Sequence, residues 1–245
     1  MTMKLSLSAR VAMFASAAAV LAMTWSVTAQ QPSADPFKSL QFRELGPTRQ
    51  GGRFVDFAVV EANPRIFYAA SASGGVFKTE NSGHTFTQLF TTEGAASIGA
   101  IAVSQSNPDV LYVGSGEGNN SRTTYSGDGV YKSTDAGKTW TNVGLKDSHH
   151  IGRVLVHPTD PNTAYVAALG HLYSENDERG LYKTIDGGKT WTKAFFRSNN
   201  TGAIDLVMDP KDPNTLYAAM WQRIRRKWSD PRVEPNYQEG GIWKT

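Results

Sequence analysis

The sequence predicts an all-β fold, a β-propeller of four-stranded antiparallel blades, and three observations support this prediction. The first is a box with the pattern Ser/Thr-x-Asp-x-Gly-x-Thr-Trp, which occupies residues 133–140 and 184–191 and returns in weaker form at residues 79–86. In such a box a short polar side chain can accept hydrogen bonds from nearby backbone N–H groups, and a glycine can take positive φ. Each box is flanked by extended runs, so it should join two antiparallel strands.

The second observation is that other pieces recur around the boxes. Each repeat has a glycine that begins an alternating apolar run, then an Asn/Asp-Pro turn followed by a strand, then a further glycine that begins the strand before the box. The third observation is the spacing, since the last glycines of this pattern (Gly75, Gly129, Gly180 and Gly241) are 54, 51 and 61 residues apart. A period near fifty with four short strands per unit is typical of propeller blades. A β-sandwich or β-solenoid is the alternative, whereas the dense Gly/Pro punctuation excludes a helical solenoid.

Residues 1–29 have the features of a signal peptide. Lys4 and Arg10 precede an apolar run over residues 11–23, and small residues lead to a cleavage site near Ala29. The run is shorter than the ~20 residues that a bilayer needs, which disfavours the alternative of an N-terminal membrane anchor. We therefore expect a secreted or periplasmic protein with no membrane attachment after cleavage.

After the signal peptide we expect a linker at residues 30–41 and a partial propeller at residues 42–245. The expected blades occupy about residues 42–94, 95–146, 147–197 and 198–245. The fourth unit stops at Thr245, the first position of its box, so about three and a half blades are present. An unfinished blade leaves sheet edges exposed, and we expect the chain to be a fragment of a longer protein whose further C-terminal blades are its partners.

Composition excludes several functions. Removing residues 1–29 takes away two basic residues and no acidic one, so the formal net charge falls from +3 to +1. This balance gives no support for nucleic-acid binding. The chain has no cysteine, which excludes disulfides, thiolate metal sites and cysteine nucleophiles.

Strand direction assigns the loops to two faces. Because each strand reverses direction, the Asx-Pro turns and the boxes should lie on one face, and the loops between second and third strands should lie on the other with the crossings between blades. The second set of loops varies most in length, so we expect ligands there. The candidate ligand-binding residues are Arg53, Arg122, Tyr125, His150, Arg153, His171, Trp221 and Arg223.

Three loop acids, Glu117, Asp128 and Glu178, are the candidate catalytic groups, although loop acids are commonly solvated or turn-forming. We expect no metal and no cofactor, since the loops lack the dense ligand pattern of hard cations. The adjacent His149 and His150 should point in opposite directions and so should not share a metal.

The aspartates of the boxes are suited to catalysis by residue type, but a turn that every blade needs should be structural. The residues expected to build these turns are Asn81, Gly83, Phe86, Ser133, Asp135, Gly137, Trp140, Thr184, Asp186, Gly188 and Trp191.

The boxes resemble the Asp-box, or BNR, repeats of sialidases, sortilin-type receptors, xyloglucan-cleaving glycosidases and propeller-type photosystem II assembly factors. Over residues 42–245 the chain is most similar to large exported bacterial proteins described as sortilin-like or BNR glycosyl hydrolases. Residues 127–140, 150–153 and 202–210 carry this likeness. The propeller of that family is much longer than this chain.

Enzyme motifs of the resembling families are incomplete in this sequence. Xyloglucan-cleaving relatives place a catalytic aspartate in an Arg-Thr-Asp-x-Gly-Gly run of the first blade, where this chain has Ala72 at the position of the acid. The Arg-Ile-Pro motif of sialidases is replaced at residues 43–47 by Arg-Glu-Leu-Gly-Pro. Glycoside hydrolysis usually needs two carboxyl groups at a set separation, and no such pair can be assigned.

The resemblance therefore implies a module that binds a carbohydrate or a protein or peptide ligand. The alternatives are a glycoside hydrolase acting on polysaccharide or sialoside, with part of its active site missing from this chain, and a scaffold or assembly factor that needs no pocket.

Overall fold

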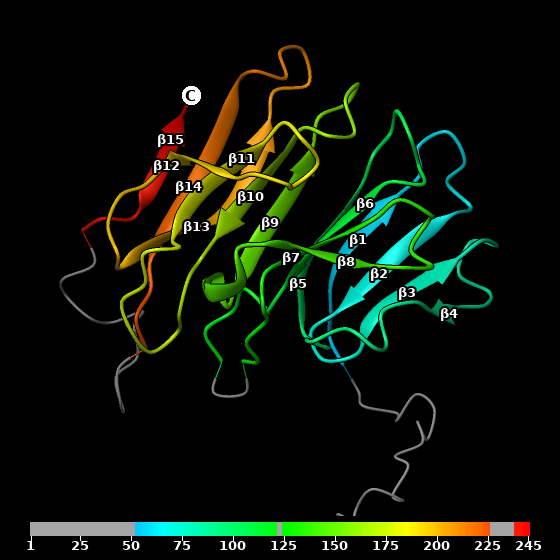
Figure 1. Ribbon diagram of the computed structural model, residues 1–245, viewed down its shortest axis with the longest axis horizontal. Helices are drawn as coiled ribbons and strands as arrows, with labels where there is room; N and C mark the ends of the chain where they lie inside the picture. Colours follow the sequence, from blue (N-terminus) through cyan, green and yellow to red (C-terminus); the bar gives the residue numbers. More distant parts are fainter. Residues whose placement is uncertain (1–51, 122–123, 226–237) are drawn as a thin grey trace, which may run out of the picture. The chain divides into compact units, whose positions relative to one another are not determined.

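The computed structural model describes residues 52–121, 124–225 and 238–245 (Figure 1). The expected signal peptide and linker lie outside the described residues. The described residues form β-strands and one short 3-10 helix, η1 (Lys146–Ser148). In this part of the chain no helix has the length and apolar character needed to cross a bilayer.

The strands form four antiparallel sheets, each a simple meander. The first sheet contains β1 (Phe54–Val59), β2 (Phe67–Ser71), β3 (Gly75–Thr79) and β4 (Thr87–Gln88), and the second contains β5 (Ile98–Val103), β6 (Leu111–Ser115), β7 (Val130–Ser133) and β8 (Thr141–Gly144). The third contains β9 (Ile151–Val156), β10 (Ala164–Ala168), β11 (Gly180–Thr184) and β12 (Thr192–Phe195), and the fourth contains β13 (Thr201–Met208), β14 (Leu216–Gln222) and β15 (Gly241–Lys244). The predicted fold class is confirmed, with an incomplete last blade.

The repeated lysine before each box has a cross-strand partner. In every sheet a tyrosine of the second strand faces a lysine of the third strand, and the Nζ atom lies 5.2–5.7 Å from the centre of the ring. The pairs are Tyr68–Lys78, Tyr112–Lys132, Tyr165–Lys183 and Tyr217–Lys244. Cross-strand pairs of this kind stabilise a sheet. The repeated tyrosine and lysine thus occupy equivalent register positions in all four sheets.

The first strands of the sheets pack against one another in chain order, β1 on β5, β5 on β9 and β9 on β13. They are the innermost strands of the blades. Among the described residues no comparable packing joins β13 to β1, so the ring of sheets is open.

Glycines that begin the innermost strands allow this close approach. A Cβ atom added at Gly99 would lie 1.9 Å from the carbonyl oxygen of Ile151 in β9, and one added at Gly152 would lie 2.1 Å from that of Ile204 in β13. No side chain fits at such distances. The recurrence of glycine at these positions therefore follows from packing between blades.

A hydrophobic core fills each of the three spaces between neighbouring sheets. At the outer rim the tryptophans of the boxes join adjacent blades. Trp191 Nε1 donates a hydrogen bond of 2.7 Å to the carbonyl oxygen of Val143 in β8, and the ring of Trp140 packs edge-on against Phe90 at 5.4 Å. The boxes of the second and third blades thus fasten each of these blades to the preceding one.

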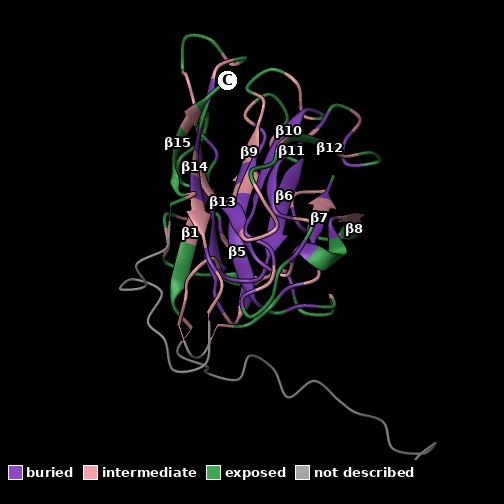
Figure 2. Cartoon of the chain, turned by 90° about the vertical axis from the view of Figure 1, so that its left-hand side faces the viewer, coloured by how far each residue is buried: buried purple, intermediate pink, exposed green. Residues whose placement is uncertain are grey.

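The first sheet has an apolar face that the described sheets leave uncovered. Phe54 and Phe57 in β1 are 57% and 55% exposed, whereas β5 and β6 are almost entirely buried (Figure 2). The two rings also contact each other at 5.8 Å. In the other innermost strands such a face is covered by a preceding blade.

The boxes are held together by short-range hydrogen bonds. In the second blade Ser133 Oγ accepts from the Gly137 N–H at 2.9 Å, and Asp135 accepts from the Thr139 N–H and hydroxyl at 2.9 and 2.7 Å. The third blade repeats these bonds at Thr184, Asp186, Gly188 and Thr190. In the first blade Thr79 Oγ1 and Asn81 Oδ1 take the same places.

The hydroxyl and N–H of Thr139 hold the pKa of Asp135 at about 2, and those of Thr190 do the same for Asp186. Both carboxylates are therefore ionised at neutral pH and accept hydrogen bonds within their own turns.

Candidate functional site

Hydrogen bonds between loops define two faces of the sheets. On one face the boxes meet the Asx-Pro turns. The N–H of Ala136 donates to the backbone carbonyl oxygen of Asp109 and that of Gly187 donates to the backbone carbonyl oxygen of Asn162, both at 2.9 Å. On the other face the blade crossings meet the loops between second and third strands. We call this second face the loop face, and it comprises residues 72–74, 89–97, 116–121, 124–129, 145–150, 169–179, 196–200 and 223–225.

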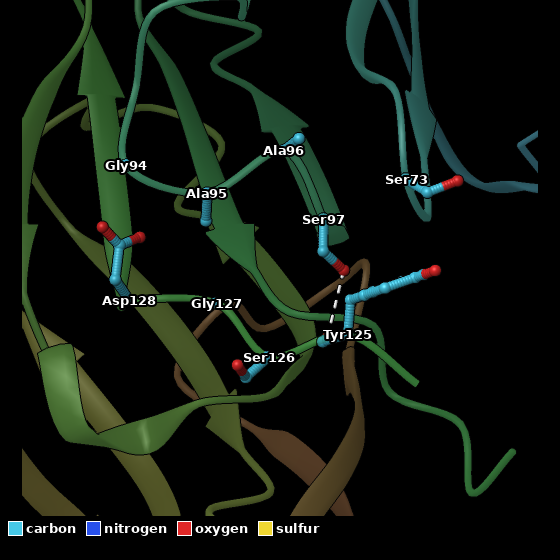
Figure 3. Close-up of a pocket in the computed structure, with 9 residues that line it drawn as sticks. All are labelled: Ser73, Gly94, Ala95, Ala96, Ser97, Tyr125, Ser126, Gly127 and Asp128. Carbon is cyan, nitrogen blue, oxygen red and sulfur yellow. Dashed lines mark hydrogen bonds between the residues drawn. The ribbon is translucent and has the colours of Figure 1, made fainter. Parts of the chain in front are cut away.

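A cleft of about 550 Å³ opens on the loop face between the first two blades (Figure 3). One wall is the crossing at residues 94–97, the other is the loop at residues 125–128, and Ser73 lies at one end. The two walls are joined where Ser97 Oγ donates a hydrogen bond of 3.1 Å to the carbonyl oxygen of Tyr125. We call this hollow the blade 1–2 cleft.

Small residues line most of the blade 1–2 cleft, and two larger side chains give it chemical character. The Tyr125 ring is 56% exposed. Asp128 is half-buried, and its Oδ2 accepts a hydrogen bond of 2.6 Å from the Tyr131 hydroxyl. Burial and this bond raise the pKa of Tyr131. The cleft therefore presents an aromatic ring and a carboxylate that is already hydrogen-bonded.

Glu117 is fully buried beside the cleft. Its Oε2 accepts hydrogen bonds from the Arg53 guanidinium and, at 2.9 Å, from Asn119 Nδ2. Its backbone carbonyl is bound by His150 Nδ1 at 2.9 Å. Glu117 thus ties the loop after β6 to the first blade, and its backbone ties the same loop to the third. A buried charge needs such partners.

His150 is an uncharged structural group. Burial, with the positive charge of Arg223 as the next cause, lowers its pKa to about 3. His150 is almost fully buried. Its ring therefore supports the loop face from beneath, through its bond to the Glu117 carbonyl oxygen. His149 follows the 3-10 helix η1 and lies outside β9, and its ring stacks on that of His171 with centres 3.8 Å apart.

Two fully buried arginines hold the loops from below. Arg223 Nη1 donates to the carbonyl oxygen of Asn119 at 2.6 Å, and Arg179 Nη2 donates to those of His171 and Ser174 at 2.6 and 3.0 Å. Burial lowers the pKa of Arg223 to about 9 and that of Arg179 to about 10, so both remain charged at pH 7. Their guanidinium groups organise backbone carbonyls and do not face solvent.

Arg153 also turns away from the loop face. It lies in β9, where Nη1 donates to Asp56 Oδ1 at 3.1 Å and Nε donates to Asp205 Oδ1 at 2.7 Å. Asp56 Oδ2 accepts from the Ile101 N–H at 3.0 Å. Burial opposes the charge of Arg153, but the bond to Asp205 and the charge of Asp56 outweigh it and raise the pKa. One cluster therefore joins the innermost strands of all four blades.

Glu178 lies in the loop after β10. Its Oε2 is buried and has no hydrogen-bond partner in the described part of the chain. Burial, followed by the charge of Asp147, raises the pKa of Glu178. Glu117 and Asp128 thus lie in the loop between β6 and β7, whereas Glu178 lies in the loop between β10 and β11.

The predicted ligand-binding residues divide into two groups. Arg53, Tyr125 and His171 reach the loop face, whereas His150, Arg153 and Arg223 are engaged beneath it or on an inner strand. Trp221 is half-buried in β14 beside Arg223, whose guanidinium lies 5.8 Å from its ring. Arg122 lies outside the described residues.

Ser97 in the cleft and the two acids that bind Arg153 were not among the predicted site residues. A signal for those acids existed, because Asp56, Arg153 and Asp205 each lie two residues before the position that pairs with the repeated tyrosine. Asp147, two residues before His149, was not predicted either.

Comparison with known proteins places this geometry in context. The family model described as Sortilin, neurotensin receptor 3 matches residues 128–233. The chain is similar to solved structures of GH74 enzymes, including one from Niastella koreensis at 22% identity and a TM-score of 0.55. Together with the hydrogen-bonded boxes, these matches support the fold of an Asp-box β-propeller. Residues 128–233 are similar to the sortilin family.

Two further structures support the propeller fold. An ancestral GH74 enzyme is 19% identical with a TM-score of 0.57, and the GH74 xyloglucanase from Xanthomonas campestris is 18% identical with a TM-score of 0.54. The three alignments cover 78–79% of this chain but only 24–29% of the enzymes. Comparison with curated protein sequences gives no match.

Proposed function

We propose that this sortilin-like propeller binds an extended polypeptide segment in the blade 1–2 cleft and does not hydrolyse glycans. The observation that carries the proposal is the state of the two acids nearest the cleft. Glu117 is buried and hydrogen-bonded by Arg53 and Asn119, and Asp128 is hydrogen-bonded by Tyr131. A general acid or nucleophile must reach the substrate, whereas these carboxylates stabilise the loop.

The first blade supports the same proposal. Ala72, at the position where xyloglucan-cleaving relatives carry an acid, is buried, and its N–H donates to the carbonyl oxygen of Arg53 at 2.9 Å. The GH74 enzymes share the fold with this chain, but an identity of 18–22% carries no activity across. Binding needs no acid at this position.

The shape and lining of the cleft favour an extended peptide. Its walls at residues 94–97 and 125–128 consist largely of glycine, alanine and serine, so a ligand can approach the main chain closely. An extended peptide is recognised by main-chain hydrogen bonds together with side-chain pockets. The Tyr125 ring offers an aromatic anchor. Both oxygens of Asp128 already accept hydrogen bonds, so Asp128 favours a basic side chain through its negative charge alone. The volume of about 550 Å³ is ordinary for a ligand site.

The test selects peptides from a random display library against the full chain and measures the affinity of the synthetic peptides by calorimetry. Tyr125→Ala, and Ser126→Trp, which places a bulky ring in the cleft, should each weaken binding at least tenfold. Tyr173→Ala is the matched control, because Tyr173 is 65% exposed in a different loop.

Two outcomes would overturn the proposal. One is a set of selected peptides whose affinity does not respond to Tyr125→Ala or Ser126→Trp. The other is release of reducing ends from xyloglucan or a sialoside by the full chain, abolished in Glu117→Gln or Asp128→Asn. The second outcome would establish the hydrolase alternative.

Export is part of the proposed function. The basic residues and apolar run of residues 1–29 support cleavage near Ala29 and a secreted or periplasmic location. Expression in a bacterial host followed by N-terminal sequencing should yield a chain that begins at Gln30 in the periplasmic fraction or the medium. A chain that keeps its first residues and stays in the membrane fraction would instead indicate an anchor.

A further inference from the structure

We infer that Asp147, His149 and His171 form a zinc-binding site on the loop face, outside the blade 1–2 cleft. Asp147 and His149 lie in the crossing between the second and third blades, and His171 lies in the loop after β10. One potential ligand atom from each residue lies within 4.8 Å of the other two. His171 Nε2 is 3.1 Å from Asp147 Oδ1, and His149 Nε2 is 3.8 Å from the same oxygen.

Neighbouring groups orient two of the three ligands. Ser174 Oγ is hydrogen-bonded to His171 Nδ1 at 2.9 Å, which leaves Nε2 of that ring toward Asp147. Asn176 Nδ2 donates to Asp147 Oδ2 at 2.9 Å, which leaves Oδ1 toward the histidines. Partners of this kind fix ring orientation and carboxylate geometry in metal sites.

The backbone at His149 also serves this arrangement. His149 has φ 57° and ψ −35°, a conformation that few residues other than glycine adopt. Its carbonyl oxygen accepts a hydrogen bond of 2.6 Å from the Gly127 N–H. The strained backbone directs the His149 ring onto His171, with ring centres 3.8 Å apart and planes 23° from parallel.

Metal binding requires a defined movement. The lone pair of an imidazole lies in the plane of the ring, so two nearly parallel rings cannot both direct Nε2 at one ion. The rings must rotate about their terminal torsions until both nitrogens stand about 2.0–2.1 Å from the metal. Asp147 is 64% exposed and His149 is 40% exposed, so the space for this rotation opens to solvent.

The ligand chemistry indicates the metal. Two imidazoles and a carboxylate suit Zn²⁺, whereas Ca²⁺ and Mg²⁺ prefer oxygen ligands alone. Three protein ligands leave a fourth tetrahedral position for water or for a group of a bound ligand. The site would fasten the blade crossing to the loop after β10.

The experiment measures binding of ZnCl₂ to the full chain without an affinity tag, by calorimetry and by metal analysis after dialysis. One zinc per chain is expected, and His149→Ala and His171→Ala should each weaken binding by at least roughly 10–100-fold, the range seen when supporting groups are lost. His84→Ala is the matched control, because His84 is exposed in the first box. It should bind like the parent chain.

A second readout guards against variants that misfold. Zinc should raise the thermal midpoint of the parent chain and of His84→Ala, but not that of His149→Ala, and Asn176→Ala should weaken zinc binding while keeping the fold. Absence of saturable binding, or equal affinity in His149→Ala and the parent chain, would overturn the inference. Either result leaves the proposed peptide binding intact, because the cleft uses other residues.

Discussion

Arg153 and Asp205 form an ion pair across two blades, with Nε 2.7 Å from Oδ1, and the same guanidinium reaches Asp56 in a third blade at 3.1 Å. The Ile101 N–H in the remaining blade donates to Asp56 Oδ2 at 3.0 Å, so these bonds join the innermost strands of all four blades. This cluster is therefore a set of interactions between blades that holds the innermost strands at a fixed separation.

The two acids of this cluster should contribute unequally to stability. The Asp56 side chain is 13% exposed and also accepts the Ile101 N–H, whereas Asp205 is 47% exposed. We expect Asp56→Asn to lower the free energy of unfolding by roughly 1–3 kcal/mol and Asp205→Asn by less than about 1 kcal/mol, because exposed pairs contribute little. Urea unfolding of both variants measures this order, and a larger loss in Asp205→Asn would contradict it.

The close approach of blades at Gly152 gives a second prediction. Gly152→Ala places a Cβ atom 2.1 Å from the carbonyl oxygen of Ile204, so β9 and β13 must move apart. We expect a loss of roughly 1–3 kcal/mol in the free energy of unfolding. Gly240→Ala is the control, since its nearest neighbour would be 3.3 Å away. Equal midpoints for the two variants would show that the inner strands tolerate the extra atom.

In the first box Asn81 stands where the other boxes have an aspartate, which indicates how those boxes should respond to mutation. Its Oδ1 accepts the Thr85 N–H at 2.9 Å, as Asp135 does with Thr139, and its Nδ2 donates to the Thr85 hydroxyl. Asp135→Asn should therefore preserve the turn, while Asp135→Ala should lower the unfolding midpoint.

Ser133→Ala should cost roughly 1–3 kcal/mol, because it leaves the Gly137 N–H without its acceptor. Chemical denaturation of these variants tests the order. If Asp135→Asn and Asp135→Ala were equally destabilised, the charge itself would be required.

The boxes also predict how stability depends on pH. The folded-state pKa of Asp135 and of Asp186 falls from 3.8 to about 2, so each carboxylate stabilises the fold fully above about pH 4. This contribution is lost as the pH falls from about 4 to about 2, since the folded state must then bind a proton it resists. A double variant with Asp135→Asn and Asp186→Asn should lose less stability over this interval. Parallel urea titrations between pH 2 and pH 7 measure the difference.

Arg223 should control the order of two loops at once. Besides Asn119, its guanidinium donates to the carbonyl oxygens of Gly118 and Gly170, both at 3.4 Å. In Arg223→Met the buried charge is removed, but these carbonyls lose their donors. We expect faster amide hydrogen exchange at residues 116–121 and 169–176, and little change in the boxes. Unchanged exchange in both loops would show that Arg179 alone is sufficient.

The strands and turns could be predicted because their interactions are local. The bonds of the box at Asp135 span two to four residues, and Tyr112 faces Lys132 within one hairpin. Such patterns repeat in the sequence wherever they repeat in space. The loop face could be assigned by strand direction alone.

The candidate site was predicted less well because its bonds join distant residues. Arg223 and Asn119 are 104 residues apart, and His150 and Glu117 are 33 apart. An arginine or histidine in a loop looks the same in sequence whether it faces solvent or lies beneath carbonyl groups. Arg223 and His150 were expected to contact ligands for this reason.

The architecture could be predicted from repeats along the chain. The boxes, the period near fifty residues and the glycines of the innermost strands identify an incomplete Asp-box propeller. These features depend on backbone hydrogen bonds and close packing that each blade must satisfy in the same way. The bonds of Arg153 to Asp56 and Asp205 and the stacking of His149 on His171 could be seen only in the folded structure. These contacts join residues of different blades or of the crossing between two blades. The sequence of a single repeat therefore does not predict them.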